Sequence, residues 1–319
     1  MGVSPVKDND LDPIAGVFPD SAPLLGDPEA LRERAEKDGM LYFKGLIPRE
    51  DILKVRMDIL RLLEKRGLTD SRHELAEGMA DAEAVDRLPA QELAWNGVGV
   101  TFEVYREVQK LESFHALAHH ANLLAMYRDL FGDEPFPHPR NIGRIMLPHR
   151  EVKATPSHQD FLHIQGEEAT WTAWIPLGDV PRELGGLAVL AGSHRSGLLG
   201  VVEAPGAGGL ESILCGLDYE WRTVDYEAGD VLTFNSLTVH KSTPNRVPGR
   251  IRMSCDYRYQ ALKPGAVIEP GSLKPHGPFS WDELYDGWER KDLQRYWENV
   301  GFAYSAYDES IRWQKEKIC

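Results

Sequence analysis

The chain has 319 residues, 42% of them hydrophobic, which is the composition of an ordinary globular protein long enough to bury a large core. Its 36 lysines and arginines against 50 aspartates and glutamates give a formal net charge of −14, and an acidic surface disfavours binding to the phosphate backbone of nucleic acids. No apolar run reaches the roughly 18 residues that a membrane-spanning helix needs, so we expect neither a nucleic-acid partner nor a membrane partner.

The cysteines and the N-terminal residues bear on the cellular compartment. Cys215, Cys255 and Cys319 are far apart and none belongs to a C-x-x-C pair, which argues against a disulfide framework or a zinc knuckle. Residues 1–20 are polar and lack the basic region and the apolar stretch of a signal peptide. We therefore expect reduced thiols and a cytoplasmic location.

The N-terminal part of the chain is predicted to be mainly helical. Residues 1–25 are expected to form a loose leader, and residues 26–135 a helical flank. Asp27 is a candidate N-cap, Pro28 suits a first helical turn, and Gly39 suits a helix end. The expected segments are a helix over 27–37, a strand over 40–46, an amphipathic helix over 49–66, a polar loop over 69–95 and one or two helices over 102–131.

After Gly132 the pattern changes to short strand-like runs separated by Gly, Pro, Asn and Asp, which is typical of a β-sandwich or barrel. We predict a mainly β fold with flanking α-helices. A double-stranded β-helix (a jelly-roll, cupin-like core) over 136–262 would be followed by a helical and looped extension over 263–319, all in one domain 1–319. The expected strands are 141–147, 161–165, 170–176, 187–190, 221–225, 230–234, 237–240 and 250–259.

The segment Ser157-His158-Gln159-Asp160 carries the main chemical signal. In an extended backbone, side chains two residues apart point to the same side, so His158 and Asp160 can reach one metal ion. His240 ends a strand-like run about 80 residues later, and a jelly roll can return that strand to the same end of the barrel. Two histidines and one carboxylate leave three coordination positions open, which suits iron(II) with a bidentate co-substrate and oxygen. Zinc hydrolases usually leave one.

A candidate anchor for a dicarboxylic co-substrate follows ten residues after His240. The guanidinium of Arg250 would pair with a carboxylate through two hydrogen bonds. Arg252 lies on the same predicted strand face and is the alternative, and Ser242 can donate a further hydrogen bond. Singly, an H-x-D motif, a core histidine and a surface arginine are common. Their joint order along the chain is what indicates a site.

These motifs resemble those of the phytanoyl-CoA dioxygenase family of iron(II)/2-oxoglutarate oxygenases. The resemblance covers about residues 140–260 and extends to the strand-like run at 38–46. The matching segments are His158-Gln159-Asp160, Trp174-Ile175-Pro176-Leu177, 185–194, 228–232, 240–245 and 250–254.

The resemblance implies a role for each matched residue. The two histidines and the aspartate of the motif would hold Fe(II), Arg250 would anchor 2-oxoglutarate, and Ser242 and Trp174 would lie beside it. The implied enzyme is a dioxygenase that uses O2 to hydroxylate, desaturate or cyclise at an unactivated C–H bond, releasing succinate and CO2, with ascorbate helpful in vitro. Related halogenases carry a small residue in place of the carboxylate, so Asp160 favours hydroxylation.

The substrate pocket and two alternative functions stay open at the level of sequence. Phe161, His163 and Gln165 alternate along an expected strand and are candidates to contact a small metabolite or natural-product intermediate. A cupin-type metal enzyme without 2-oxoglutarate would not need Arg250, and a non-catalytic metal- or ligand-binding module would show no turnover. The Gly-rich segment 205–209 lacks the Lys-Ser/Thr of a phosphate loop, so we expect a flexible loop near the mouth. The sequence does not indicate the oligomeric state.

Overall fold

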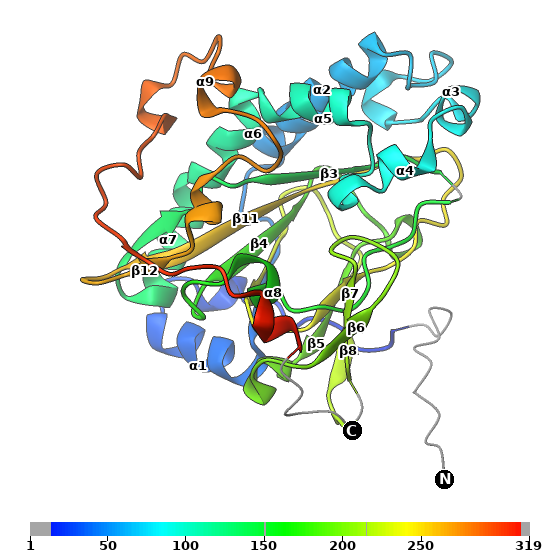
Figure 1. Ribbon diagram of the computed structural model, residues 1–319. Helices are drawn as coiled ribbons and strands as arrows, with labels where there is room; N and C mark the ends of the chain where they lie inside the picture. The colour runs from blue at the N-terminus through cyan, green and yellow to red at the C-terminus, as the bar shows by residue number, and fades with distance from the viewer. Residues whose placement is uncertain (1–13, 150, 215, 314–319) are drawn as a thin grey trace.

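The computed structural model describes residues 14–149, 151–214 and 216–313. Its centre consists of two antiparallel sheets that face each other (Figure 1). The larger sheet has the strand order β1-β9-β4-β11-β2, with β3 also paired to β11, and the smaller sheet has the order β10-β5-β8. The prediction of a jelly-roll core flanked by helices is therefore confirmed.

The strands are short except for β11, which runs through the middle of the larger sheet. The larger sheet contains β1 (Met40–Phe43), β2 (Glu134–Pro137), β3 (Ile142–Met146), β4 (Trp171–Pro176), β9 (Val231–Asn235) and β11 (Arg252–Leu262). The smaller sheet contains β5 (Leu187–Ala191), β8 (Glu220–Arg222) and β10 (His240–Ser242). Two further pairs are β6 (Val201–Glu203) with β7 (Leu210–Ser212), and β12 (Val267–Ile268) with β13 (Ala303–Tyr304).

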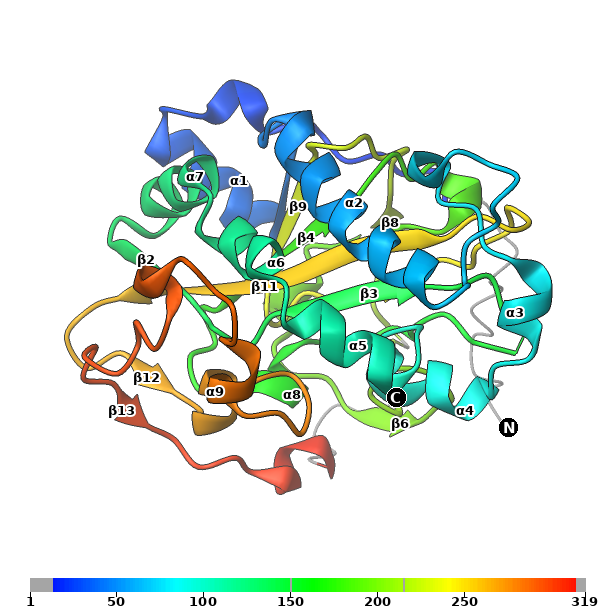
Figure 2. The same ribbon diagram turned by 90° about the horizontal axis from the view of Figure 1, so that it is seen from above.

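Helices cover the outer face of the larger sheet (Figure 2). The largest cluster of buried apolar side chains joins the helices α1, α2, α5 and α7 to that face, and burial of this kind is the main stabilising contribution in a domain of this size. The helices are α1 (Pro28–Asp38), α2 (Arg49–Lys65), α3 (Ala82–Asp86), α4 (Ala90–Leu93), α5 (Phe102–Gln109), α6 (Glu112–Ala116), α7 (Ala121–Phe131), α8 (Phe161–Ile164) and α9 (Trp281–Leu284). None of the described helices is long and apolar enough to cross a membrane.

Strand β11 has two chemically different faces, and this difference positions the site. Alternate residues along a strand point to opposite sides of the sheet. One set packs against the helices and is apolar or aromatic, namely Met253, Cys255, Tyr257 and Tyr259. The other set points between the two sheets and is polar or charged although buried, namely Arg252, Ser254, Asp256, Arg258 and Gln260. The inside of the jelly roll is therefore charged along this strand.

Several local predictions can be compared with the structure. Asp27 caps α1 by accepting a hydrogen bond from the Ala30 N–H, and Gly39 ends the helix in the left-handed conformation with φ 67°, so both ends of this helix are confirmed. The strand predicted over 161–165 is wrong, because these residues form the short helix α8 and Gln165 ends it with φ 47°. The β6–β7 hairpin, whose tip is the Gly-rich segment 205–209, was not predicted.

Both ends of the described chain pack onto the jelly roll. Residues 1–13 of the expected leader lie outside the described residues, as do Cys215 and Cys319. The part from 14 to 25 forms bridges to the sheets at Gly16 and Asp20, and the Phe18 side chain is buried between them. The C-terminal extension packs a third apolar cluster against Phe136 of β2, so it covers the end of the larger sheet where β11 finishes.

Candidate metal centre

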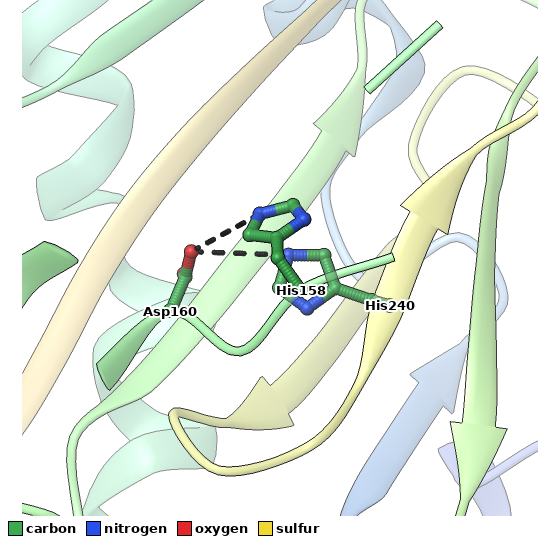
Figure 3. A group of neighbouring side chains, drawn as sticks. All are labelled: His158, Asp160 and His240. Carbon is green, nitrogen blue, oxygen red and sulfur yellow. Dashed lines mark ion pairs between the residues drawn. The ribbon is translucent and has the colours of Figure 1, made fainter. Parts of the chain in front are cut away.

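Three side chains converge inside the jelly roll, and they are the predicted triad. The Nε2 atoms of His158 and His240 each lie 3.8 Å from Oδ1 of Asp160 (Figure 3). All three residues are buried, and one ligand atom from each lies within 4.8 Å of the others. Distances of 3.8 Å are too long for hydrogen bonds, so the three atoms are arranged around a shared point.

The backbone brings the two histidines together directly. His158 and His240 face each other in an antiparallel bridge, and each backbone N–H donates to the other residue's carbonyl over 3.0 Å. This bridge joins the segment before the motif to the edge of β10. Asp160 differs from the prediction, because its backbone is helical (φ −61°, ψ −31°) and it forms the N-cap of α8. The carboxylate therefore reaches the histidines from a turn, and the extended H-x-D geometry predicted from the sequence is wrong.

Hydrogen bonds fix which nitrogen each histidine presents. Nδ1 of His158 lies 2.8 Å from the Pro156 carbonyl, and Nδ1 of His240 lies 3.1 Å from the Thr238 carbonyl. A carbonyl can only accept, so both Nδ1 atoms carry the proton and both Nε2 atoms offer a lone pair. Burial lowers the pKa of both imidazoles, that of His240 to about 3. Neutral imidazoles with this orientation are suited to bind a metal ion.

The carboxylate of Asp160 is held by its other oxygen. Thr172 Oγ1 donates to Oδ2 over 2.6 Å, and the Arg258 guanidinium lies 3.4 Å from the same atom. Burial opposes ionisation of Asp160, but the charge of Arg258 and the hydrogen bond from Thr172 keep its pKa below the ordinary value. One anionic oxygen and two neutral imidazole nitrogens on one side form the donor set that fits an iron(II) ion with open positions.

A second set of predicted residues lies further along β11. Arg252 is 4% exposed, and its Nη1 donates to Ser254 Oγ over 2.9 Å. Within the described ranges it has no carboxylate partner within 4 Å, and burial lowers its pKa to about 10. Arg252 and Ser242 both line a cavity of about 1390 Å³. The triad side chains do not line this cavity, although Ser157 and Ser242, which do, are close neighbours of the ligands in sequence.

Arg250 occupies a different position from Arg252. It precedes β11 in the segment where Met79 forms an isolated bridge, and it does not line the cavity. Its charge acts on Arg56, which belongs to α2, and on Asp179. The two arginines that the sequence left as alternatives are thus separated in space. Ser254, two residues after Arg252 on the same strand face, was not singled out from the sequence.

The remaining predicted residues lie in different surroundings. Trp174 is buried between the sheets, with its ring 4.7 Å from that of Tyr226. Phe161 and His163 are half-buried on α8, and the His163 ring lies 5.9 Å from that of His158. Gln165 exchanges two hydrogen bonds, of 2.9 and 2.7 Å, with the backbone of Asp308. This side chain therefore ties the C-terminal segment to the centre.

Sequence reasoning missed two residues that contact the triad, Thr172 and Arg258. They lie opposite each other on β4 and β11, in the register Thr172↔Arg258. Directly opposed residues in an antiparallel pair share one face of the sheet. The sequence shows a charged residue between tyrosines in β11, which could have indicated a buried charge. The strand that pairs with it cannot be identified without the register.

Comparison with known proteins gives a family match and several relatives. A family model described as "Phytanoyl-CoA dioxygenase" matches residues 35–254. The 1-deoxypentalenic acid 11-beta-hydroxylase of Streptomyces exfoliatus is 31% identical over 260 residues, covering 76% of this chain and 84% of that protein. The protein of the same name from Streptomyces arenae is 30% identical over 262 residues, with the same coverage. The peroxisomal phytanoyl-CoA dioxygenase of Rattus norvegicus is 26% identical, covering 71% of this chain and 67% of that protein.

Two solved structures share the fold. The epimerase SnoN in complex with Fe3+, alpha ketoglutarate and nogalamycin RO superposes with a TM-score of 0.50 at 20% identity, covering 74% of this chain and 84% of that chain. The non-heme monooxygenase ThoJ in its apo form superposes with a TM-score of 0.50 at 18% identity, covering 73% of this chain and 78% of that chain.

Proposed function

This chain belongs to the phytanoyl-CoA dioxygenase family, and on that premise we propose that it hydroxylates an unactivated C–H bond of a small organic metabolite. It is an iron(II)- and 2-oxoglutarate-dependent oxygenase. The proposal covers the residues that perform this activity and the kind of molecule on which it acts. It rests chiefly on one observation: two neutral imidazole Nε2 atoms and one carboxylate Oδ1 converge in a buried site.

His158, Asp160 and His240 are the proposed iron ligands. The backbone carbonyls that accept from each Nδ1–H hold the rings, and Thr172 holds the carboxylate. Outer hydrogen bonds of this kind orient metal ligands and are commonly needed for full metal affinity. One ligand atom from each of the three side chains lies within 4.8 Å of the others, so all three can reach a single iron ion.

Arg252 is the proposed anchor for the distal carboxylate of 2-oxoglutarate, with Ser254 and Ser242 as further donors. Arg252 is buried on the inner strand face and lines the cavity together with Ser242. Among the described residues, no carboxylate lies within 4 Å of its guanidinium. Its placement favours it over Arg250. A buried guanidinium gains most from a carboxylate that can accept two parallel hydrogen bonds.

When bound, iron(II), 2-oxoglutarate and O2 supply the oxidising power, with succinate and CO2 as products of the co-substrate. The chain's own residues position and shield these groups. The triad fixes one side of the centre, Arg252 would orient the co-substrate, and the buried surroundings exclude bulk water, which strengthens each electrostatic contact.

The substrate is proposed to be a small molecule in the class of natural-product intermediates. Both Streptomyces relatives are named for hydroxylation of 1-deoxypentalenic acid. At about 30% identity the chemistry can be retained while the substrate differs, so we propose the class and not that compound. A cytoplasmic location stays a prediction from the sequence.

An anaerobic titration tests the proposed residues. Apo protein receives iron(II) and then 2-oxoglutarate while the visible charge-transfer band is recorded. We expect a band in the wild type, its loss in His240→Ala, and a 2-oxoglutarate affinity that is weakened in Arg252→Gln and unchanged in Arg250→Gln. A band lost in Arg250→Gln and kept in Arg252→Gln would reverse the anchor assignment. Iron binding without any band would favour a cupin-type enzyme that does not use 2-oxoglutarate.

A further inference from the structure

A second group of arginines lies at the end of the barrel that carries the metal triad. The backbone N–H of His138 donates to the Arg258 carbonyl over 2.7 Å, which continues the pairing of β2 with β11. Arg140 follows two residues later and is half-buried, and its Nη1 donates to the Pro275 carbonyl over 2.7 Å. The charges of Arg140, Arg144 and Arg258 all act on the buried His276. Three guanidinium groups therefore lie near enough to His276 for their charges to act on it.

The carboxylates nearby do not balance these arginines. Asp256 is engaged by Arg144, whose Nε donates to it over 2.7 Å. Asp160 lies 3.4 Å from Arg258 but belongs to the metal triad. Glu269 acts on Arg140, yet its carboxylate already caps a 3-10 helix by accepting from the Gly271 N–H over 2.7 Å. Among the described residues, Arg140 has no carboxylate within 4 Å.

Unused hydrogen-bonding atoms lie in the same place. Arg258 is 5% exposed, and its Nε has no hydrogen-bond partner among the residues that the structure describes. Buried polar atoms without partners are rare in native proteins, and a cluster of them usually marks a place for water or a ligand. His138 Nδ1, which is buried opposite Arg258, is also without a partner. A buried cation with a free donor facing other cations is costly unless an anion joins it.

We propose that the substrate of this enzyme carries a carboxylate, and that Arg258 and Arg140 bind it beside the metal triad. This inference rests on the proposed function and names the group by which the substrate is recognised. A metal ion bound by the triad would share the negative charge of Asp160. Arg258 would then lack a full counter-charge. The co-substrate cannot supply that counter-charge with its distal carboxylate, because the proposed anchor Arg252 begins β11 and lies six residues before Arg258 on that strand.

The geometry also restricts where the substrate is oxidised. Arg258 touches the carboxylate of Asp160, so an acid held by Arg258 would place its carbon framework directly beside the metal position. The C-terminal extension supports this arrangement, because the segment carrying Gly271 and Pro275 accepts both recorded hydrogen bonds of the Arg140 guanidinium. These contacts fix the position of the Arg140 guanidinium.

The experiment uses the full-length protein loaded with iron(II) and saturating N-oxalylglycine, an unreactive analogue that fills the 2-oxoglutarate position. The probes are hydrophobic monocarboxylic acids, including 1-deoxypentalenic acid, each paired with its methyl ester. Binding is followed by thermal shift and by titration of the metal spectrum. We expect at least one acid to bind at least roughly tenfold more tightly than its ester, as the loss of a charge-assisted pair predicts.

Variants then assign the preference to residues. Arg140→Gln should weaken binding of the acid by about tenfold and remove its advantage over the ester, whereas Arg140→Lys should restore part of it. Arg290→Gln removes an exposed arginine of the same extension that pairs with Asp292, and should change nothing. Arg258→Gln should act like Arg140→Gln, and it is compared only after iron and N-oxalylglycine are shown to bind.

Each outcome separates this inference from the proposed function. If iron and N-oxalylglycine fail to bind the wild type, the proposed function is wrong. If they bind but no acid does, if esters bind as well as acids, or if Arg140→Gln keeps the full preference, the carboxylate subsite is wrong and the oxygenase assignment stands.

Discussion

Thr172 donates a 2.6 Å hydrogen bond to the oxygen of Asp160 that faces away from the histidines. The two residues come from different elements, since Thr172 lies in β4 and Asp160 precedes α8. The bond leaves Oδ1 directed at both Nε2 atoms. The position of the oxygen that we propose as an iron ligand therefore depends on a hydroxyl outside the triad.

The first prediction follows from this bond. Thr172→Val keeps the shape of the side chain and removes its donor, so the carboxylate should lose its fixed orientation. We expect the iron(II) affinity to fall by about tenfold or more, the usual effect of removing an outer partner of a metal ligand. Equilibrium dialysis or competition with a chelating dye measures this.

Thr233→Val provides the matched control for this change. Thr233 is a buried threonine of the same sheet whose hydroxyl bonds to Tyr127 on the helix side over 2.6 Å. Its loss should lower the free energy of unfolding by about 1 kcal/mol and leave iron affinity unchanged. Equal effects of the two variants on iron binding would show that Thr172 acts only through general stability.

The second prediction concerns Ser254. Its hydroxyl accepts from Arg252 over 2.9 Å and so can hold that guanidinium in place for the co-substrate. Ser254→Ala should raise the KM for 2-oxoglutarate several-fold, while the iron affinity and the KM for the substrate remain as in the wild type. A KM for 2-oxoglutarate that does not change would mean that Ser254 plays no part in binding the co-substrate.

The sequence predicted the triad because its signal is local. The H-x-D motif and the histidine that ends a strand-like run can both be identified along the chain, and the backbone bridge between His158 and His240 then brings them together. The choice between Arg250 and Arg252 could not be made in the same way. Their positions have the same parity, and only the residue at which β11 begins separates the buried one from the other.

Long-range contacts explain what the sequence could not show. Arg258 meets Thr172 through the register of β11 with β4, and Arg140 is oriented by carbonyls more than 130 residues away. Helix α8 was missed because apolar and polar residues alternate over 162–165, as they do in a strand. Its first turn is fixed by tertiary contacts, including the hydrogen bond from the Phe161 N–H to the Ser236 carbonyl.

The third prediction concerns acid sensitivity. Burial lowers the pKa of His115 from 6.5 to about 4. Nε2 of His115 donates to the Gln109 carbonyl over 3.0 Å, and its Nδ1 accepts from the Asn141 amide over 3.0 Å. Protonation of Nδ1 would place its N–H opposite the N–H of the Asn141 amide, so this hydrogen bond would be lost. The unfolded chain therefore takes up a proton near pH 6.5 that the folded protein refuses until about pH 4.

The contribution of His115 to the free energy of unfolding is constant above about pH 6.5 and falls as the pH decreases toward 4, by up to roughly 3 kcal/mol. Urea unfolding at a series of pH values measures the slope. His115→Asn should flatten the slope between these limits, whereas the same change at His73, which is exposed, should not. An unchanged slope in His115→Asn would assign the acid sensitivity to other groups.

The fourth prediction concerns the tip of the β6–β7 hairpin. A Cβ added at Gly97 would lie 2.2 Å from the Ala207 Cβ and 2.9 Å from Nη1 of Arg144. The tip of the hairpin thus rests against the segment after α4, beside an arginine that points between the two sheets. A Cβ added at Gly208, which lies at the same tip, would be 3.0 Å from the ring of His163. The hairpin therefore closes the side of the jelly roll next to the metal centre.

Gly97→Ala should displace this tip. Gly209→Ala is the matched control, because Gly209 has nearly the same backbone angle (φ 67° against 66°) and nothing within 4 Å of the added carbon. Both variants carry the cost of alanine at positive φ, about 1 kcal/mol, but only Gly97→Ala adds the steric clash, worth roughly 1–3 kcal/mol more. We expect faster protease cleavage within 204–209 and a raised KM for the substrate in Gly97→Ala alone. Equal behaviour of the two variants would show that the contact between the tip and Gly97 does not close the site, because backbone strain alone would then account for both.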